Sequence, residues 1–152
     1  MKIIIIILLF IAGSTLSSCK YEPIYSQKEM NFKISKIEIE NKNKINLEIK
    51  DNLNIYKNIK SSNEIVLEID SQKNITTISK DANGNPKKFE MKIIVSLNVL
   101  QNENLKEKIK FTENFKYNNI SNKFNLKQYE NNIQKNLLDQ IFQKILIYLS
   151  TI

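Results

Sequence analysis

The longest alternating run of the chain constrains its fold more than any other feature. In residues 89–99 every odd-numbered residue is apolar, and every even-numbered residue except Ile94 is polar. Successive side chains of a β-strand point to opposite faces, so a strand with this pattern has one apolar face. An apolar sheet face must be covered by another layer. The run therefore predicts a sheet with one buried face and one polar face.

A further strand is predicted in residues 30–40. The even-numbered positions are apolar up to Ile34, whereas the odd-numbered positions are apolar from Ile37 onward. A one-residue change of phase inside a strand indicates a β-bulge or a bend. We therefore expect a strand that is interrupted between these two isoleucines.

The strand before the long run is predicted in residues 65–78. Its apolar residues change phase across the polar stretch 71–74, where we expect a bulge. The dipeptide Asn83-Gly84 follows, and Asn-Gly between apolar runs is a strong signal for a two-residue hairpin loop. Such a loop would place Ile78 opposite Phe89.

A fourth strand is predicted in residues 105–117, where the apolar side chains lie mostly at odd-numbered positions. Odd positions must then face odd positions across the preceding hairpin. A three-residue loop at 102–104 or a five-residue loop at 100–104 satisfies this condition. A loop of two or four residues satisfies it only with a bulge.

Two helices complete the prediction. The first spans about residues 45–59, because its apolar residues follow helical spacing; a short strand in residues 45–49 is the competing interpretation. These apolar residues are Ile45, Ile49, Leu53, Tyr56 and Ile59.

The second helix is predicted near the C-terminus, with Asn125 as N-cap and Gln128 completing a capping box. Phe124 and Tyr129 occupy the positions of a hydrophobic staple. Burial against the sheet of the same chain is the main expectation for its apolar surface, and contact with another protein is the alternative. Its apolar residues are Leu126, Tyr129, Ile133, Leu137, Leu138, Ile141, Phe142, Ile145, Leu146 and Leu149.

Together these elements predict one α+β domain in residues 30–152. Their order is β-α-β-β-β-α, which gives a two-layer sandwich. One layer is a mostly antiparallel sheet of about four strands, and the other layer contains the two helices.

The N-terminus has the pattern of a signal peptide. Lys2 is followed by ten apolar residues, 3–12, and then by small residues that lead to Cys19. Ten apolar residues are too few to span a bilayer, which needs about twenty. The sequence Leu16-Ser17-Ser18-Cys19 resembles a bacterial lipobox, in which cleavage exposes a cysteine that carries lipid. We therefore expect residues 1–18 to be removed and residues 19–29 to form a lipidated tether; a stray cysteine is the alternative.

Composition excludes several kinds of chemistry. The chain has no histidine, one cysteine and two glycines. It therefore lacks imidazole acid-base groups and histidine metal ligands, and it cannot form a glycine-rich phosphate loop. No carboxylate cluster stands out either. We expect a protein that is not an enzyme and that has no metal and no cofactor.

The polar face of the predicted sheet is basic. Its even-numbered positions include Glu90 and a set of lysines, namely Lys88, Lys92, Lys106, Lys108, Lys110 and Lys116. One interpretation is a solvated face that discourages edge-to-edge aggregation. The other is an anion-binding surface, since lysine suits phosphate as a compact charge. An exported protein would meet phosphorylated glycolipid there rather than nucleic acid.

The segment Cys19-Lys20-Tyr21-Glu22-Pro23-Ile24-Tyr25 resembles the mature start of LPS-assembly lipoproteins (the LptE family) of the alphaproteobacterial type. That family opens with a lipidated cysteine, an aromatic residue, a proline, an aliphatic residue and a tyrosine. Residues 122–129, followed by Asn132 and Asn136, look like its last helix. The chain departs from the family where lysine, asparagine and Ser26 replace arginine, alanine and glycine, so only Cys19 transfers by position.

The resemblance implies an outer-membrane lipoprotein that faces the periplasm. Such a protein plugs and stabilises the LPS-assembly β-barrel LptD and binds lipopolysaccharide (LPS). Lys20 fits this location, because an aspartate there favours retention at the inner membrane. We expect Lys88, Lys92, Lys106, Lys108 and Lys110 to contact LPS phosphate. The alternatives are an unrelated outer-membrane lipoprotein with a structural role and a module that binds a small amphiphile.

Overall fold

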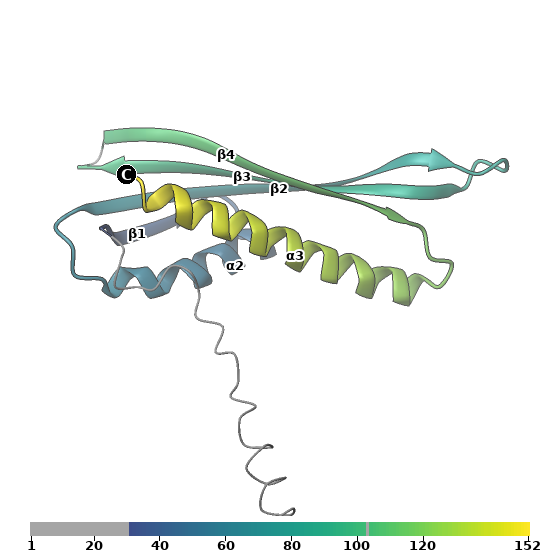
Figure 1. Cartoon of the computed structure of the whole chain (residues 1–152), viewed down its shortest axis with the longest axis horizontal. Coiled ribbons are helices and arrows are strands. Elements are labelled where there is room, and N and C mark those ends of the chain that lie inside the picture. The colour runs from purple at the N-terminus through teal and green to yellow at the C-terminus, as the bar shows by residue number, and fades with distance from the viewer. Residues whose placement is uncertain (1–30, 103) are drawn as a thin grey trace, which may run out of the picture.

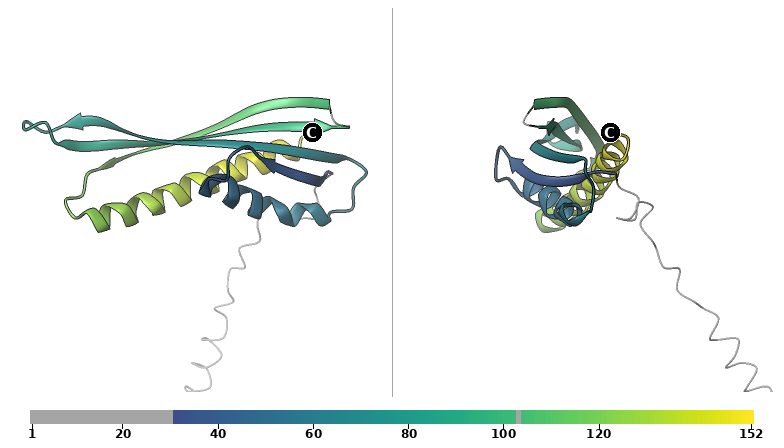
Figure 2. Two further views of the ribbon diagram at one scale, coloured as in Figure 1. Left: turned by 180° about the vertical axis from the view of Figure 1, so that it is seen from behind. Right: turned by 90° about the vertical axis from the view of Figure 1, so that its left-hand side faces the viewer.

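The computed structural model describes residues 31–102 and 104–152. They form a four-stranded sheet in the order β1-β2-β3-β4, with all helices of the described chain on one side (Figures 1 and 2). The elements are β1 (Lys33–Ile39), α2 (Lys44–Leu53), the 3-10 helix η2 (Asn54–Asn58), β2 (Glu64–Lys80), β3 (Pro86–Gln101), β4 (Asn104–Asn118) and α3 (Lys123–Leu149). The predicted two-layer α+β architecture is confirmed.

The core lies between the sheet and the helices. The odd-numbered side chains from Met91 to Val99 are fully buried there. Each such side chain contributes about 1.5–3 kcal/mol to folding through loss of contact with water. The even-numbered positions of the same strand are exposed or half-buried on the open face. The alternation in residues 89–99 thus fixes the orientation of the sheet.

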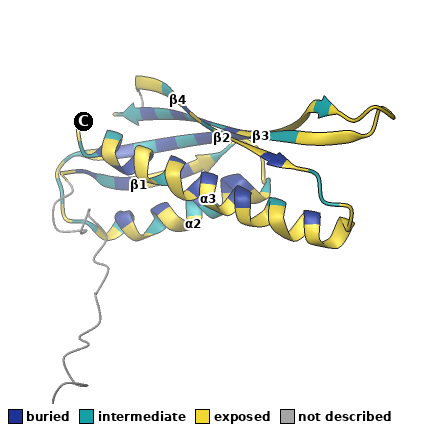
Figure 3. Cartoon of the chain, turned by 45° about the vertical axis from the view of Figure 1, so that its right-hand side comes forward, coloured by how far each residue is buried: buried dark blue, intermediate teal, exposed yellow. Residues whose placement is uncertain are grey.

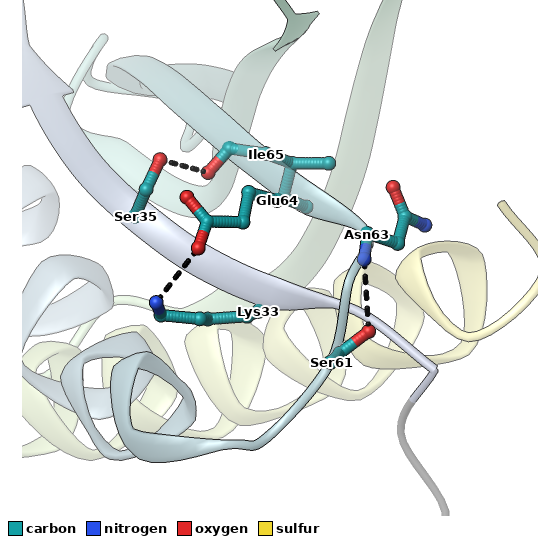
Figure 4. Close-up of polar contacts among 6 residues, drawn as sticks. All are labelled: Lys33, Ser35, Ser61, Asn63, Glu64 and Ile65. Carbon is teal, nitrogen blue, oxygen red and sulfur yellow. Dashed lines mark hydrogen bonds and ion pairs between the residues drawn. The ribbon is translucent and has the colours of Figure 1, made fainter.

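Strand β1 contains the bulge that its change of phase predicts. Its register with β2 shifts between Ile34 and Lys36, and Ser35 is the extra residue. The Ser35 hydroxyl donates to the carbonyl oxygen of Ile65 at 3.0 Å, which holds the bulge against β2 (Figure 4). Both Ile34 and Ile37 are buried as a result. The β1–β2 pair is parallel, and α2 with η2 lies in the crossover between the two strands.

The β2–β3 hairpin differs from its prediction. Thr77 rather than Ile78 lies opposite Phe89, and the irregularities fall between Thr77 and Lys80 rather than in residues 71–74. The connection spans residues 81–85, because the Asp81 carboxylate accepts hydrogen bonds from the backbone N–H groups of Asn83 and Asn85. The side chain of Asp81 thereby organises a longer loop than a type I′ turn would need.

The odd-to-odd register predicted for β3 and β4 is confirmed, because Val95 lies opposite Phe111 and Leu97 opposite Ile109. The connection has two residues, 102 and 103, and a register shift beside Val99 restores the parity. Asn102 has a positive φ of 52°, which asparagine tolerates better than most residues. The loop is therefore the bulged two-residue alternative.

Helix α2 and η2 together occupy the predicted helical segment, and the competing strand in residues 45–49 is wrong. Helix α3 begins earlier than predicted. Its N-cap is Asn122, whose side-chain oxygen accepts from the N–H groups of Phe124 and Asn125. Asn125 is therefore inside the first turn, and Phe124 is 68% exposed, so the predicted cap and hydrophobic staple are wrong. Asparagine is a favoured N-cap residue, and Asn122 and Asn125 lie within one turn of each other, so residue type alone does not distinguish them.

The apolar surface of α3 packs against the sheet of the same chain. Ile141 and Ile145 are fully buried, and most of the predicted stripe is buried with them. Two hydrogen bonds from tyrosine hydroxyls to glutamates also join α3 to β4, namely Tyr117 to Glu130 and Tyr148 to Glu107. The main expectation for the apolar surface of α3, burial against the sheet of the same chain, is therefore confirmed.

Candidate functional site

The candidate site is the open face of the sheet, which the helices leave uncovered (Figure 2). Cross-strand pairing arranges its even-numbered side chains in rows. One row contains Asn74, Lys92 and Asn114, and another contains Asp70, Ser96 and Lys110. The structure therefore places Lys88, Lys92, Lys108 and Lys110 on a shared face.

These lysines form two groups rather than one. Lys88 and Lys92 lie toward the β2–β3 loop, whereas Lys108 and Lys110 lie opposite Asn98 and Ser96 near the other end of β3. The rows of Lys92 and Lys110 are four residues apart along β3, which corresponds to about 13 Å. We call the first pair the distal lysines and the second pair the proximal lysines.

Lys106 belongs to neither pair. It falls at the register shift beside Val99 and has no partner on β3. A bulge interrupts the alternation of side chains, so parity does not place Lys106 with Lys108 and Lys110. The role of all five lysines in phosphate contact stays a prediction.

The proximal lysines line a groove that also carries acidic residues. The groove has a volume of about 450 Å³. Along one side lie four carboxylates, and Ser96 and Asn98 separate them from the lysines. The Asn98 amide donates to the Glu68 carboxylate at 2.9 Å. The four acidic residues are Glu38, Glu40, Glu68 and Asp70.

Sequence reasoning missed this acidic side. The signal was present, because Glu68 and Asp70 alternate with the buried residues Leu67 and Ile69 and therefore point to the open face. Only the pairing of β2 with β3 brings them across from the lysines of β4. The proximal part of the open face is thus mixed in charge rather than uniformly basic.

Most residues at the end of the sheet nearest the β2–β3 loop are exposed (Figure 3), and apolar residues are among them. Ile75, Met91 and Phe115 form one cross-strand row. Met91 is buried, but Ile75 and Phe115 remain 40% and 45% exposed. Nearby, Tyr129 of α3 packs edge-on against Tyr117 with ring centres 6.0 Å apart. This end therefore presents an apolar patch on the helix-facing side, opposite to the face that carries the distal lysines.

Two tyrosines between β4 and α3 have raised pKa values. Burial is the main cause, and a hydrogen bond to a glutamate adds to it in each case. For Tyr148, whose hydroxyl donates to Glu107, the pKa rises to about 12. For Tyr117, whose hydroxyl donates to Glu130 at 2.8 Å, the pKa is raised further. Both hydroxyls therefore stay protonated at neutral pH and act as donors that hold the helix.

Part of the sequence interpretation lies outside the described residues. Cys19, the signal peptide and the tether all fall in residues 1–30. Within the described part of the chain, no cluster of three metal-ligating side chains occurs. No helix of that part is both long enough and apolar enough to span a membrane.

Comparison with solved structures shows where this fold occurs. A minor lipoprotein from Acinetobacter baumannii superposes with a TM-score of 0.59 at 16% identity, over 78% of this chain and 90% of that chain. Rare lipoprotein B from Shewanella oneidensis gives 0.52 at 15% identity, over 74% and 95%. A putative lipoprotein from Caulobacter crescentus gives 0.58 at 12% identity, over 82% and 92%. No family model and no curated protein matches the sequence. The chain therefore shares its fold with bacterial lipoproteins.

Proposed function

We propose that the chain is a lipid-anchored lipoprotein of the outer membrane that binds LPS and plugs and stabilises the LptD β-barrel. The observation that carries the proposal is the shared fold, because the similar structures are bacterial lipoproteins covered over 90% or more of their length. The lipobox ending at Cys19 supports it independently, since it predicts the same anchoring from residues outside the fold.

The distal lysines are the best candidates for contact with LPS phosphate. Lys88 and Lys92 lie four residues apart on one strand face, with Glu90 between them and with Asn118, Asn74 and Asn114 as cross-strand neighbours. Among the described residues, neither lysine forms an ion pair. Their charges are thus available to an anion, whereas the proximal lysines share a groove with four carboxylates.

The apolar patch at the same end is the best candidate for contact with a barrel protein. Ile75 and Phe115 are exposed on the helix-facing side of this end, whereas Lys88 and Lys92 project from its open face. An exposed apolar patch is typical of a protein interface. In this arrangement one end of the sheet serves both the partner and the lipid.

Binding rather than catalysis is the proposed activity. The groove on the open face is lined by carboxylates, lysines, amides and Ser96, with Ile39 and Ile69 at its base. Such walls suit a polar head group better than an acyl chain. The core beneath the sheet is filled, since Ile93, Val95 and Leu97 are fully buried. The arrangement favours a head-group contact over carriage of an amphiphile inside the domain.

Co-purification tests the proposal most directly. The chain is tagged at its C-terminus and isolated from solubilised outer membrane, and bound proteins are identified by mass spectrometry. We expect a large β-barrel protein to co-purify in near-stoichiometric amount, together with LPS. A Cys19→Ala variant serves as the control and is expected to lose membrane attachment. Recovery of the membrane-anchored protein without any barrel protein would contradict the proposed partner. It would leave the proposed lipid anchoring unaffected.

A further inference from the structure

A notch on the helical side of the sheet is lined by cationic side chains. It lies where α2 begins, between β2 and α3, and has a volume of about 420 Å³. Three of its lining residues are lysines from three different elements, and none is acidic. The lining residues are Asn43, Lys44, Ile45, Ser71, Lys73, Lys127, Asn131 and Gln134.

The position of Lys73 is unusual for a strand of this kind. Odd-numbered residues of β2 face the helices, and Ile65, Leu67 and Ile69 are fully buried there. Ser71 and Lys73 continue the same phase, since no register shift occurs until Thr77. Ser71 is still buried, whereas Lys73 is exposed just beyond the covered part of the sheet. Strand β1 ends opposite Ile69, so the notch begins where the sheet loses that neighbour.

Gln134 provides a donor that no described residue uses. It is only 8% exposed, and its Oε1 accepts from the Lys73 ammonium at 2.8 Å. Lysine can only donate, so the amide oxygen must face it, and the NH₂ group must then point elsewhere. No hydrogen bond among the described residues engages that NH₂ group. The NH₂ group reaches solvent rather than being enclosed in the core, so it is free to donate to an anion in the notch.

The start of α2 adds backbone donors in a fixed place. Asn43 caps the helix by accepting from the N–H of Asn46 at 2.8 Å. The same side chain exchanges hydrogen bonds with Ser71, as donor to its carbonyl oxygen and as acceptor from its hydroxyl, both at 3.2 Å. The first two N–H groups, of Lys44 and Ile45, have no partner among the described residues. Such groups and the helix dipole favour an anion.

We propose that this notch is a binding site for a phosphate group. The lysines at 44, 73 and 127 supply the charge, the Gln134 amide supplies a side-chain N–H donor, and the start of α2 supplies two backbone N–H groups. Lys127, Asn131 and Gln134 are spaced by four and three residues, so they share one face of α3. No ion pair among the described residues neutralises the three lysines. This site is separate from the open face and does not depend on the proposed function.

The test uses the full ¹⁵N-labelled chain in a non-ionic detergent at low ionic strength, titrated with inorganic phosphate and followed by NMR. We expect saturable shifts of the Lys44 and Ile45 amides and of the Gln134 side-chain NH₂. Lys127→Gln removes a charge without removing a hydrogen bond of the described structure, and Lys73→Gln removes the partner of Gln134. Each is expected to weaken binding about tenfold, as loss of one charge-assisted hydrogen bond predicts.

Lys135→Gln is the matched control, because Lys135 is an exposed lysine on α3 outside the notch. Dihexanoyl phosphatidic acid and dihexanoyl phosphatidylcholine distinguish the sources of phosphate. If phosphatidic acid competes with inorganic phosphate and phosphatidylcholine does not, the site binds a phosphomonoester head group. If neither lipid competes, the site binds the free ion. Absence of saturable shifts with every probe, or equal weakening by the control, overturns the proposal.

Discussion

The two halves of the long β2–β3 hairpin show how the same strands behave with and without a covering layer. In the covered half, residues 65–71 and 93–99, the odd-numbered side chains are almost completely buried. In the distal hairpin, residues 72–92, every residue of β2 except Ser79 is exposed, and Met91 is the buried exception on β3 (Figure 3). The difference arises because β1 and α2 do not reach the distal hairpin: β1 ends opposite Ile69, and α2 begins beside Ser71 and covers the other half.

The comparison teaches that alternation alone does not determine burial. Ile69 and Ile75 occupy the same phase of β2, yet one is 1% exposed and the other 40% exposed. The covered half contains most of the buried apolar surface, whereas the distal hairpin leaves apolar and basic side chains exposed.

Truncation of one apolar side chain in each half of the hairpin should give very different losses of stability. Leu97→Ala in the covered half is expected to lower the free energy of unfolding by about 3 kcal/mol, because it leaves a cavity in a filled core. Ile75→Ala in the distal hairpin is expected to cost less than about 1 kcal/mol. Urea denaturation of both variants measures the difference. Equal losses would show that the distal hairpin belongs to the core.

The two lysine pairs should contribute unequally to LPS binding. Lys88→Gln with Lys92→Gln is expected to weaken binding about tenfold at low salt, because these charges have no acidic groove beside them. Lys108→Gln with Lys110→Gln is the matched variant and should cost about threefold, since four carboxylates offset its charge. LPS affinity should depend less on salt concentration in the Lys88→Gln, Lys92→Gln variant than in the Lys108→Gln, Lys110→Gln variant, because the first has lost the charges that contribute more to binding. Unchanged affinity in both would remove the sheet face from LPS contact.

Alkaline pH should loosen the contact of α3 with the proximal part of β4. The pKa of Tyr148 is raised from 10.0 to about 12, so the folded state keeps a proton that the unfolded state releases. This contribution is complete below pH 10 and is lost as the pH rises toward 12. Tyr148→Phe should therefore show a shallower fall of unfolding free energy over that interval. A slope identical to that of the unmodified chain would assign the pH dependence to other groups.

The loop of the distal hairpin should respond locally to acid. Backbone hydrogen bonds, chiefly from Asn85, hold the pKa of Asp81 below its ordinary value of 3.8. The loop is therefore most ordered above that value, and it loosens as the pH falls through the lower folded pKa. Asp81→Ala should speed amide exchange at Asn83 and Asn85 without moving the urea midpoint. A shifted midpoint would show that the loop stabilises the whole domain.

Much of the fold follows from local patterns in the sequence. The change of phase in residues 30–40 predicts the bulge at Ser35, and helical spacing predicts both helices. The β2–β3 loop was mispredicted because the Asp81 side chain, rather than a type I′ turn, sets its length. The start of α3 was mispredicted because two asparagines compete as N-cap within one turn.

The candidate sites were less predictable, because both depend on pairing between distant segments. Alternation identifies lysines on β3 and β4, but only the register shows that they form two groups. The four carboxylates of the groove come from β1, β2 and the residue after β1. Lys73 lay in a stretch that polarity alone assigned to a bulge. Its contact with Gln134 links residues 61 positions apart, which no local pattern encodes.

The parallel pairing of β1 with β2 has a consequence for the order of folding. Strands β2, β3 and β4 are joined by short hairpins, so their contacts are local and form quickly. Strand β1 precedes them in the chain, yet its sheet partner lies beyond a crossover that contains α2 and η2. A chain delivered from its N-terminus must therefore hold β1 unpaired until β2 is available. We expect the docking of β1 onto β2 to be the late step of folding.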